Sequence, residues 1–257
     1  MGALVRLAAL LLVLPACRAT PEWEPVGGFE LVPSAAEWRD LSAAELRAWL
    51  EAARAQLTPV KDYTGTLETR ERIGDDLHPR RVMHIQLREQ PFAVAIETLE
   101  PASEAGQRVW YDESRSRELV AETPGFLGKL VGHVSLDPEG DLAMENRRHA
   151  ITDTGLTRLL EQVEEEFVPA LARRPRLRVA ELAFGDTPLR VVDAVVPREP
   201  PDPPLVQRLG FQVEGGLLTY YGLAELLPDG LALVEEYAYR DLVLDPGLAP
   251  ATFAPPK

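Results

Sequence analysis

Two sets of short runs, in which apolar and polar residues alternate, constrain the fold of this chain more than any other feature. A period of two is typical of strands with one buried and one exposed face. Turn residues such as Gly74-Asp75-Asp76 separate the runs. The runs are 63–68, 81–88, 92–99, 108–111 and 117–121, followed by 177–184, 189–196, 207–213, 217–223 and 231–242. Their close spacing predicts a meandering antiparallel sheet of about ten strands.

A helix is predicted over residues 42–57, before the first strand. Ser42 and Glu45 have the spacing of a capping box, and Leu41 can pack against Leu46 as a hydrophobic staple. Apolar residues then recur at helical spacing along one face. Pro59 ends the pattern.

A second helix is predicted over residues 154–168, between the two sets of strands. Its apolar residues share one face, and the acidic run Glu164–Glu166 marks a solvated face. Pro169 is expected to stop or kink it. A sheet of this many strands rarely stays flat and open. We therefore predict an α+β, mainly β fold, in which a strongly curved antiparallel sheet or half-open β-barrel is covered by helices.

The beginning of the chain resembles a bacterial lipoprotein signal peptide. Arg6 supplies a positive charge, and residues 7–14 form an apolar run too short to span a bilayer. The sequence Leu14-Pro15-Ala16-Cys17 then resembles a lipobox. We expect residues 1–16 to be removed and Cys17 to be the lipid anchor. The alternative is an ordinary secretory signal cleaved near Ala16.

Residues 17–41 are rich in Pro, Gly and Glu, which predicts a lipid-anchored tether to a single domain at 42–257. The Pro-rich stretch 197–204 cannot pair as a central strand, so we expect a loop or an edge. The lipobox resemblance implies a cell-envelope protein that is attached to a membrane and faces the periplasm. Arg18 after the cysteine favours the outer membrane over the inner one.

Composition argues against several classes of function. The formal net charge of −14 argues against nucleic acid and against electrostatic binding to anionic lipid surfaces. Cys17 is the only cysteine, so the domain can form no internal disulfide and no thiolate metal site. The four histidines lack H-x-x-x-H spacing, and no G-x-S-x-G elbow is present. We therefore predict no catalytic residues, no metal and no cofactor.

Three stretches resemble a known family. They are residues 60–67 with 86–92, residues 135–151 leading into Gly155-Leu156, and residues 236–248 closing on Phe253. Together they resemble the DUF1571 family of bacterial exported proteins over roughly residues 45–253. More distantly, the layout is similar to the LolA/LolB lipoprotein-carrier superfamily. That resemblance implies a half-open antiparallel barrel closed by helices over an apolar cavity, with no catalytic residues to carry over.

Candidate ligand-binding residues lie on the expected barrel rim and in the stretch before the second helix: Tyr63, Arg88, Tyr111, Arg148, His149, Tyr237 and Tyr239. Tyr237 and Tyr239 share one strand face, where they either contact a ligand or pack against a covering helix. The Arg-His stretch either receives an anionic head group, helped by the following helix N-terminus, or anchors the turn at Asp137-Pro138.

Three functions remain open at this point. The leading hypothesis is a non-enzymatic envelope lipoprotein that holds a lipid or a lipoprotein acyl chain in a half-barrel cavity. The alternative is a structural lipoprotein that binds another envelope protein and has no ligand cavity. The third is a hydrolase that uses acidic residues, although the pairs Asp75-Asp76 and Asp137-x-Glu139 are typical of solvated turns.

Overall fold

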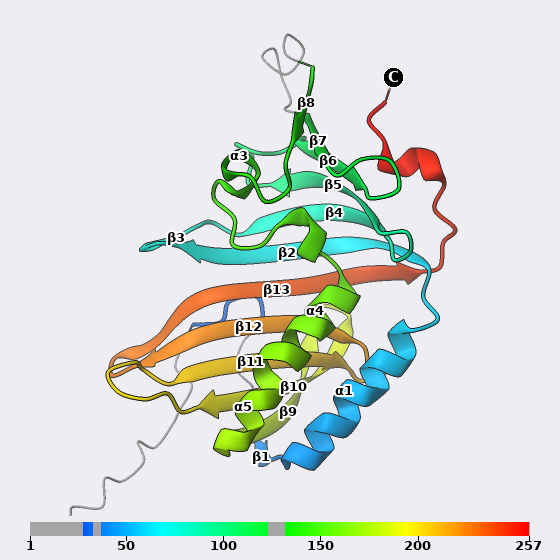
Figure 1. The fold of residues 1–257 in the computed structure, drawn as a ribbon. Helices are drawn as coiled ribbons and strands as arrows, with labels where there is room; N and C mark the ends of the chain where they lie inside the picture. The colour runs from blue at the N-terminus through cyan, green and yellow to red at the C-terminus, as the bar shows by residue number, and fades with distance from the viewer. Residues whose placement is uncertain (1–27, 33–36, 123–131, 257) are drawn as a thin grey trace, which may run out of the picture.

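The computed structural model describes residues 28–32, 37–122 and 132–256 (Figure 1). The expected signal peptide, the lipid anchor Cys17 and most of the expected tether lie outside these residues.

The described residues form one antiparallel sheet of 13 strands. Along the sheet the order is β1-β9-β10-β11-β12-β13-β2-β4-β5-β6-β7-β8, with β3 paired to β2. The strands are β1 (Arg39–Asp40), β2 (Asp62–Ile73), β3 (Asp76–Leu77), β4 (Arg81–Arg88), β5 (Ala93–Glu100), β6 (Arg108–Asp112), β7 (Leu119–Glu122), β8 (His133–Leu136), β9 (Arg176–Phe184), β10 (Thr187–Val196), β11 (Leu205–Gln212), β12 (Leu218–Leu227) and β13 (Gly230–Leu244).

Two meanders, β2–β8 and β9–β13, meet where β13 pairs with β2. All ten strands expected from the alternation are present, and residues 197–204 form the loop between β10 and β11. The alternation missed β1, β3 and β8 because two to four residues are too few to show a period. The fold is therefore a mainly β antiparallel sheet with few helices, and its end strands β1 and β8 are not paired with each other in the described chain.

Helix α1 (Ala43–Leu57) begins at the expected capping box. The Ser42 hydroxyl accepts the Glu45 N–H, and the Glu45 carboxylate accepts the Ser42 N–H. Its apolar face packs beside α4 (Leu156–Gln162), and both helices cover the same face of the sheet (Figure 1). Among the described residues, none of the helices is both long and apolar enough to cross a membrane.

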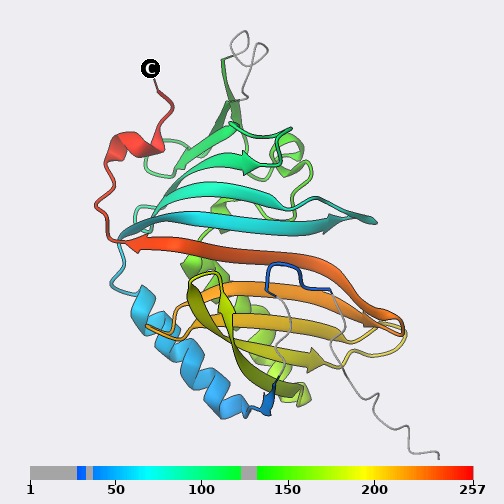
Figure 2. The same cartoon turned by 180° about the vertical axis from the view of Figure 1, so that it is seen from behind.

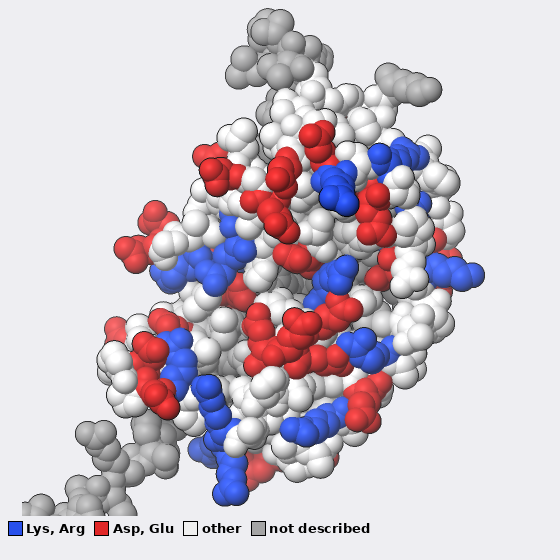
Figure 3. Space-filling model, in the orientation of Figure 1, with Lys and Arg blue, Asp and Glu red and all other residues white. Residues whose placement is uncertain are grey.

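The segment containing α4 is longer than expected. A 3-10 turn at Ile151–Asp153 precedes α4, and π-helical residues Val163–Phe167, α5 (Val168–Ala170) and a second 3-10 turn at Leu171–Arg173 follow it. Pro169 does not stop the helix, which was one of the two outcomes expected of it. The wider π-helical turn, closed by the Val168 N–H on the Val163 carbonyl, precedes the proline and carries the chain past it. The acidic residues of this segment gather on its outer side (Figure 3).

Residues 28–32 lie on the face of the sheet opposite the helices (Figure 2). Phe29, Leu31 and Val32 are buried, and the N–H groups of Glu30 and Leu31 donate to the Glu236 carboxylate at 3.1 and 3.3 Å. Farther along, β1 pairs with β9. Part of the stretch expected to be a tether therefore packs on the domain.

Candidate functional site

A groove of about 470 Å³ lies over β5–β8, on the face of the sheet that carries the helices. We call it the β5–β8 groove. One wall is the sheet itself, and the other is the segment of residues 138–154 that leads into α4. The sheet contributes the apolar side chains Ile96, Val109, Leu119, Ala121 and Leu136, and the facing segment contributes Pro138, Leu142, Ala143, Ala150 and Ile151.

The facing segment covers the groove only loosely. Its short helix α3 (Asp141–Met144) has no buried residue, and Leu142 is 72% exposed. Val134 on β8 is also exposed, at 40%. The segment starts with a turn in which the Asp137 side chain accepts the Glu139 N–H at 3.1 Å, as a local Asx turn does. The groove is thus open to solvent along an apolar rim.

Two carboxylates lie on adjacent strands at the inner end of the groove. Glu71 on β2 and Glu235 on β13 are directly opposite each other in the sheet register, and both are buried. Like charges in this position destabilise a sheet. Their burial therefore requires cations or hydrogen-bond donors close by.

The stretch Arg148-His149 supplies those cations. Arg148 Nε donates to Glu235 Oε2 at 2.7 Å, its backbone N–H donates to Glu71 Oε1 at 3.3 Å, and His149 Nε2 lies 3.1 Å from Glu235 Oε2. Asn146 precedes them with φ of 60°, a conformation that asparagine tolerates and that turns the chain onto the sheet. The hydrogen bond to Glu235 raises the pKa of His149 against the effect of its burial.

These contacts also affect the pKa of Glu235, and burial affects the pKa of Tyr237. Burial acts to raise the pKa of Glu235, but the hydrogen bond and charge of His149, with Arg148, hold it below the ordinary value. Glu71 accepts a 2.5 Å hydrogen bond from the Tyr237 hydroxyl, whose pKa burial raises well above its usual range. Tyr237 and His149 are also in edge-to-face contact, with ring centroids 5.7 Å apart.

Two further arginines line the groove beside this cluster. Arg81 donates to both carboxylate oxygens of Glu104, at 2.8 and 3.3 Å, and to the Asn146 carbonyl at 3.1 Å. The Arg147 side chain, in contrast, makes no hydrogen bond and no ion pair with any residue that the structure describes. Burial, and then the charge of Arg81, lower the pKa of Arg147.

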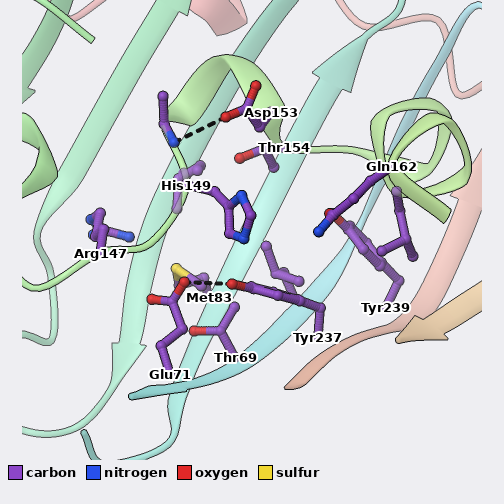
Figure 4. A pocket seen from close by; sticks show the side chains of 14 residues that line it. Thr69, Glu71, Met83, Arg147, His149, Asp153, Thr154, Gln162, Tyr237 and Tyr239 are labelled. Atoms are coloured by element: carbon purple, nitrogen blue, oxygen red, sulfur yellow. Dashed lines mark hydrogen bonds between the residues drawn. The ribbon is translucent and has the colours of Figure 1, made fainter. Parts of the chain in front are cut away.

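A smaller cavity of about 60 Å³ adjoins the groove and reaches Tyr237 and Tyr239 (Figure 4). The groove and this cavity share Ile96, Arg147, His149, Ala150 and Thr154 in their walls. Figure 4 shows Arg147 on one side of His149, with Gln162 and Tyr239 on the other.

Two buried tyrosine hydroxyls hold the start of α4. The Gly155 N–H donates to the Tyr239 hydroxyl at 2.9 Å, and the Leu156 N–H donates to the Tyr63 hydroxyl at 2.7 Å. Gly155 itself has φ of +126°, and a Cβ there would lie 2.9 Å from the Tyr63 hydroxyl. The anion-binding role expected for this helix N-terminus has no support, because these two donors are already used.

The candidate residues from the sequence thus separate into three groups. His149, Tyr237 and Tyr239 line the side cavity, and His149 also lines the groove. Arg148 lies beside them on Glu235 without lining either space, and Tyr63 lies in the core. The other two lie elsewhere: Arg88 pairs with Asp112 and contacts the Phe253 ring, and Tyr111 packs against Phe92. The Arg-His stretch is anchored on Glu235, and no described contact joins it to the turn at Asp137-Pro138.

Four charged residues around the groove were not predicted from the sequence: Glu71, Arg81, Glu104 and Glu235. One signal was available for two of them. Glu71 continues the inward face of Tyr63 and Leu67 at even spacing, and Glu235 does the same for Tyr237 and Tyr239. A charge at an inward strand position is a reason to look for a buried polar site.

Three other kinds of site, a metal site, an acidic hydrolase site and a basic surface, have little support among the described residues. No group of three or more His, Cys, Asp or Glu side chains there could hold a metal ion. Asp75, Asp137 and Glu139 are exposed residues in or beside turns, and Asp76, also exposed, begins β3. On the face shown in Figure 3, described Lys and Arg side chains are interspersed with Asp and Glu and form no continuous basic surface.

Comparison with known proteins identifies the family. A family model described as "Protein of unknown function (DUF1571)" matches residues 60–257. The chain belongs to the DUF1571 family. The resemblance expected from the three sequence stretches is therefore confirmed. A search of curated proteins found no match to this DUF1571 protein.

Several solved structures are similar to this DUF1571 protein at low identity. Lipoprotein LppX from Mycobacterium tuberculosis is 10% identical over 81% of this chain and 99% of its own, with a TM-score of 0.47. A putative outer membrane lipoprotein-sorting protein domain from Vibrio parahaemolyticus is 12% identical over 79% and 95%, with a TM-score of 0.38. A LolA superfamily protein from Nitrosomonas europaea is 15% identical over 81% and 97%, with a TM-score of 0.33.

Proposed function

We propose that this DUF1571 protein is a non-enzymatic envelope lipoprotein that binds a lipid or a lipoprotein acyl chain in the β5–β8 groove. The observation that carries the proposal is an open groove of about 470 Å³ whose walls combine apolar side chains from both the sheet and the facing segment with polar and charged ones such as Arg81, Glu104 and Arg147. Pockets of about 300–1,000 Å³ with apolar walls and a few polar groups are the usual sites for small organic ligands.

The β5–β8 groove is not the site expected from the sequence, which was a cavity between the sheet and its two covering helices. The apolar faces of α1 and α4 are packed against the sheet in the largest core cluster, and the side cavity between α4 and β13 has a volume of only about 60 Å³. In this proposal the curved, half-barrel part of the sheet is β4–β8, and the ligand takes the position that helices occupy over the other half.

The exposed rim supports an apolar occupant. Leu142 and Val134 expose large apolar surfaces at the mouth of the groove, where a bound chain would cover them. Anchoring through Cys17, and delivery to the outer membrane, are parts of the same proposal. An anchored protein with an open apolar groove is suited to hold a hydrophobic molecule near the membrane and away from water.

Native mass spectrometry of the protein extracted under mild conditions, with lipid extraction of the same sample, tests this proposal. A bound apolar molecule is expected, and Ala121→Trp is expected to displace it by filling the groove. Ser135→Trp is the matched control, because Ser135 is exposed on the neighbouring strand and does not line the groove. A ligand-free protein that stays unchanged after incubation with envelope lipids, or equal loading of both variants, would contradict the proposal.

One observation favours a second function, the binding of another envelope protein. The outer edge of β8 has no strand partner among the described residues, and Val134 on it is exposed. Such an edge can pair with a strand of another chain. Crosslinking in cells that captures an envelope protein through β8, from a protein that carries no lipid, would select this function.

A further inference from the structure

We propose that Arg147 binds the anionic head group, a carboxylate or a phosphate, of an amphiphilic ligand whose apolar chain lies in the β5–β8 groove. This inference rests on the proposed function and specifies the class of ligand. It makes Arg147 the residue that distinguishes an anionic amphiphile from a neutral one.

The carboxylates Glu71, Glu104 and Glu235 at the inner end of the groove each have a donor from the chain. Glu104 is held by Arg81, and Glu235 by Arg148 and His149. Glu71 accepts from the Tyr237 hydroxyl and the Arg148 N–H, with Arg81 Nη1 3.9 Å from its other oxygen. Arg147 remains as a cation without a partner of its own in the described chain.

The position of Arg147 suits a ligand better than a structural role. Arg147 is one of the residues that line both the groove and the side cavity. It is largely removed from water, which lowers its pKa. A desolvated guanidinium attracts an anion more strongly than an exposed one does, because the surroundings screen the charge less.

The nearby carboxylates do not prevent an anion from binding there. Glu104 and Glu235 have cations, Glu71 accepts from the Tyr237 hydroxyl, and Asp153 accepts the Ala150 N–H at 3.2 Å. None of these carboxylates forms an ion pair with Arg147, so its N–H groups can donate to an anion. A guanidinium also offers two parallel N–H groups, which match the two oxygens of a carboxylate or phosphate. An apolar chain would extend from this head group past Ile96 and Val109 toward Leu142 at the rim.

The test compares two ligands that differ only in the head group. Dodecanoate and dodecan-1-ol are titrated against the delipidated full-length protein that carries a fluorescent fatty-chain probe, and displacement gives both affinities. The wild-type protein is expected to prefer the carboxylate by about tenfold, the usual size of one charge-assisted hydrogen-bonded contact. Arg147→Gln is expected to abolish the preference without weakening the alcohol, and Arg147→Lys to retain part of it.

Arg108→Gln is the matched control. Like Arg147→Gln, it removes one positive charge, but from β6, where Arg108 pairs with Glu97 on the other face of the sheet. The preference for dodecanoate over dodecan-1-ol should therefore persist in this variant. Inorganic phosphate and acetate form a further arm of the test. They are expected not to displace the probe at concentrations at which dodecanoate does.

The possible failures are distinguishable. If neither ligand binds the wild-type protein, the proposed function itself fails. If both bind equally, the groove holds apolar chains and the role of Arg147 is refuted, whether or not Arg147→Gln folds. If phosphate or acetate alone binds through Arg147 and the chain adds nothing, the site takes free anions and this inference is overturned.

Discussion

Removing one partner of the Arg208–Asp193 pair should destabilise the protein more than any surface change. The two residues lie opposite each other on β11 and β10, with side-chain exposures of 1% and 0%. Arg208 donates to both Asp193 oxygens at 2.6 and 2.8 Å, and its Nη1 donates to the Val32 carbonyl at 2.8 Å. Its guanidinium also lies 4.5 Å from the Phe29 ring centroid. The pair therefore supports the sheet and the docked residues 28–32 together.

The expected magnitude follows from the burial. Asp193→Ala leaves a buried guanidinium without its carboxylate, which costs about 3–5 kcal/mol. For a domain of this size that corresponds to a fall in Tm of about 6–20 °C. Replacing both partners with apolar residues of similar volume, as in Asp193→Leu with Arg208→Met, should cost far less than the two single changes together, because no uncompensated charge remains.

A double-mutant cycle measures this coupling. The free energy of unfolding is determined with guanidinium chloride as denaturant for the wild type, each single variant and the double variant. The matched control is Glu181→Ala, which breaks the exposed cross-strand contact of Glu181 with Arg190 and should cost less than about 1 kcal/mol. Single changes at Asp193 and Arg208 whose costs add without coupling, or that cost no more than Glu181→Ala, would show that the two residues do not stabilise the sheet as a pair. Faster proteolysis near residue 32 in Arg208→Met would follow from the lost contact with Val32.

Two further predictions concern Glu236 and Gly155. Burial raises the pKa of Glu236 from its ordinary 4.5 to about 7, so the stability that it contributes is complete below pH 4.5 and is lost as the pH rises through 7. Glu236→Gln keeps an acceptor for Tyr220 and has no such titration, so the wild type should lose about 3 kcal/mol relative to this variant between pH 4.5 and 7. Unfolding measured at several pH values checks this, and a constant difference would contradict it. Gly155→Ala should lower the free energy of unfolding. Backbone strain at φ of +126° alone costs about 1–3 kcal/mol, and the Cβ contact of 2.8 Å with Leu87 adds to it. Gly74→Ala, with φ of +60° and open space around it, is the control and should cost clearly less in the same unfolding assay.

Local signals predicted much of the fold. The capping box at Ser42 and Glu45 placed the start of α1, because a cap depends only on residues three apart. The period-two runs placed ten strands, and the same period placed Tyr237 and Tyr239 on one face with Ala238 on the other. Pro169 left two outcomes open, since the effect of a proline depends on the turn before it.

The candidate site could be predicted only in part. The stretch Arg148-His149 was noticed because Arg and His cluster just before a helix. Its partner Glu235 could not be inferred, because the direct pairing of Glu71 with Glu235 depends on the register between β2 and β13, which lie far apart in the chain. The same register brings Tyr237 close enough to Glu71 for its hydroxyl to donate.

The amino-acid sequence alone predicts the nature of each segment: which runs are strands, which faces are apolar, and where helices begin. These properties depend on neighbours within a few residues, so they can be inferred from local patterns. That the helices cover one half of the sheet and leave a groove over β5–β8 follows only from the folded structure. The folded structure also determines that Arg147 lacks a partner in the described chain while Arg148 has one, since pairing among charges depends on distances between segments that the chain brings together only on folding.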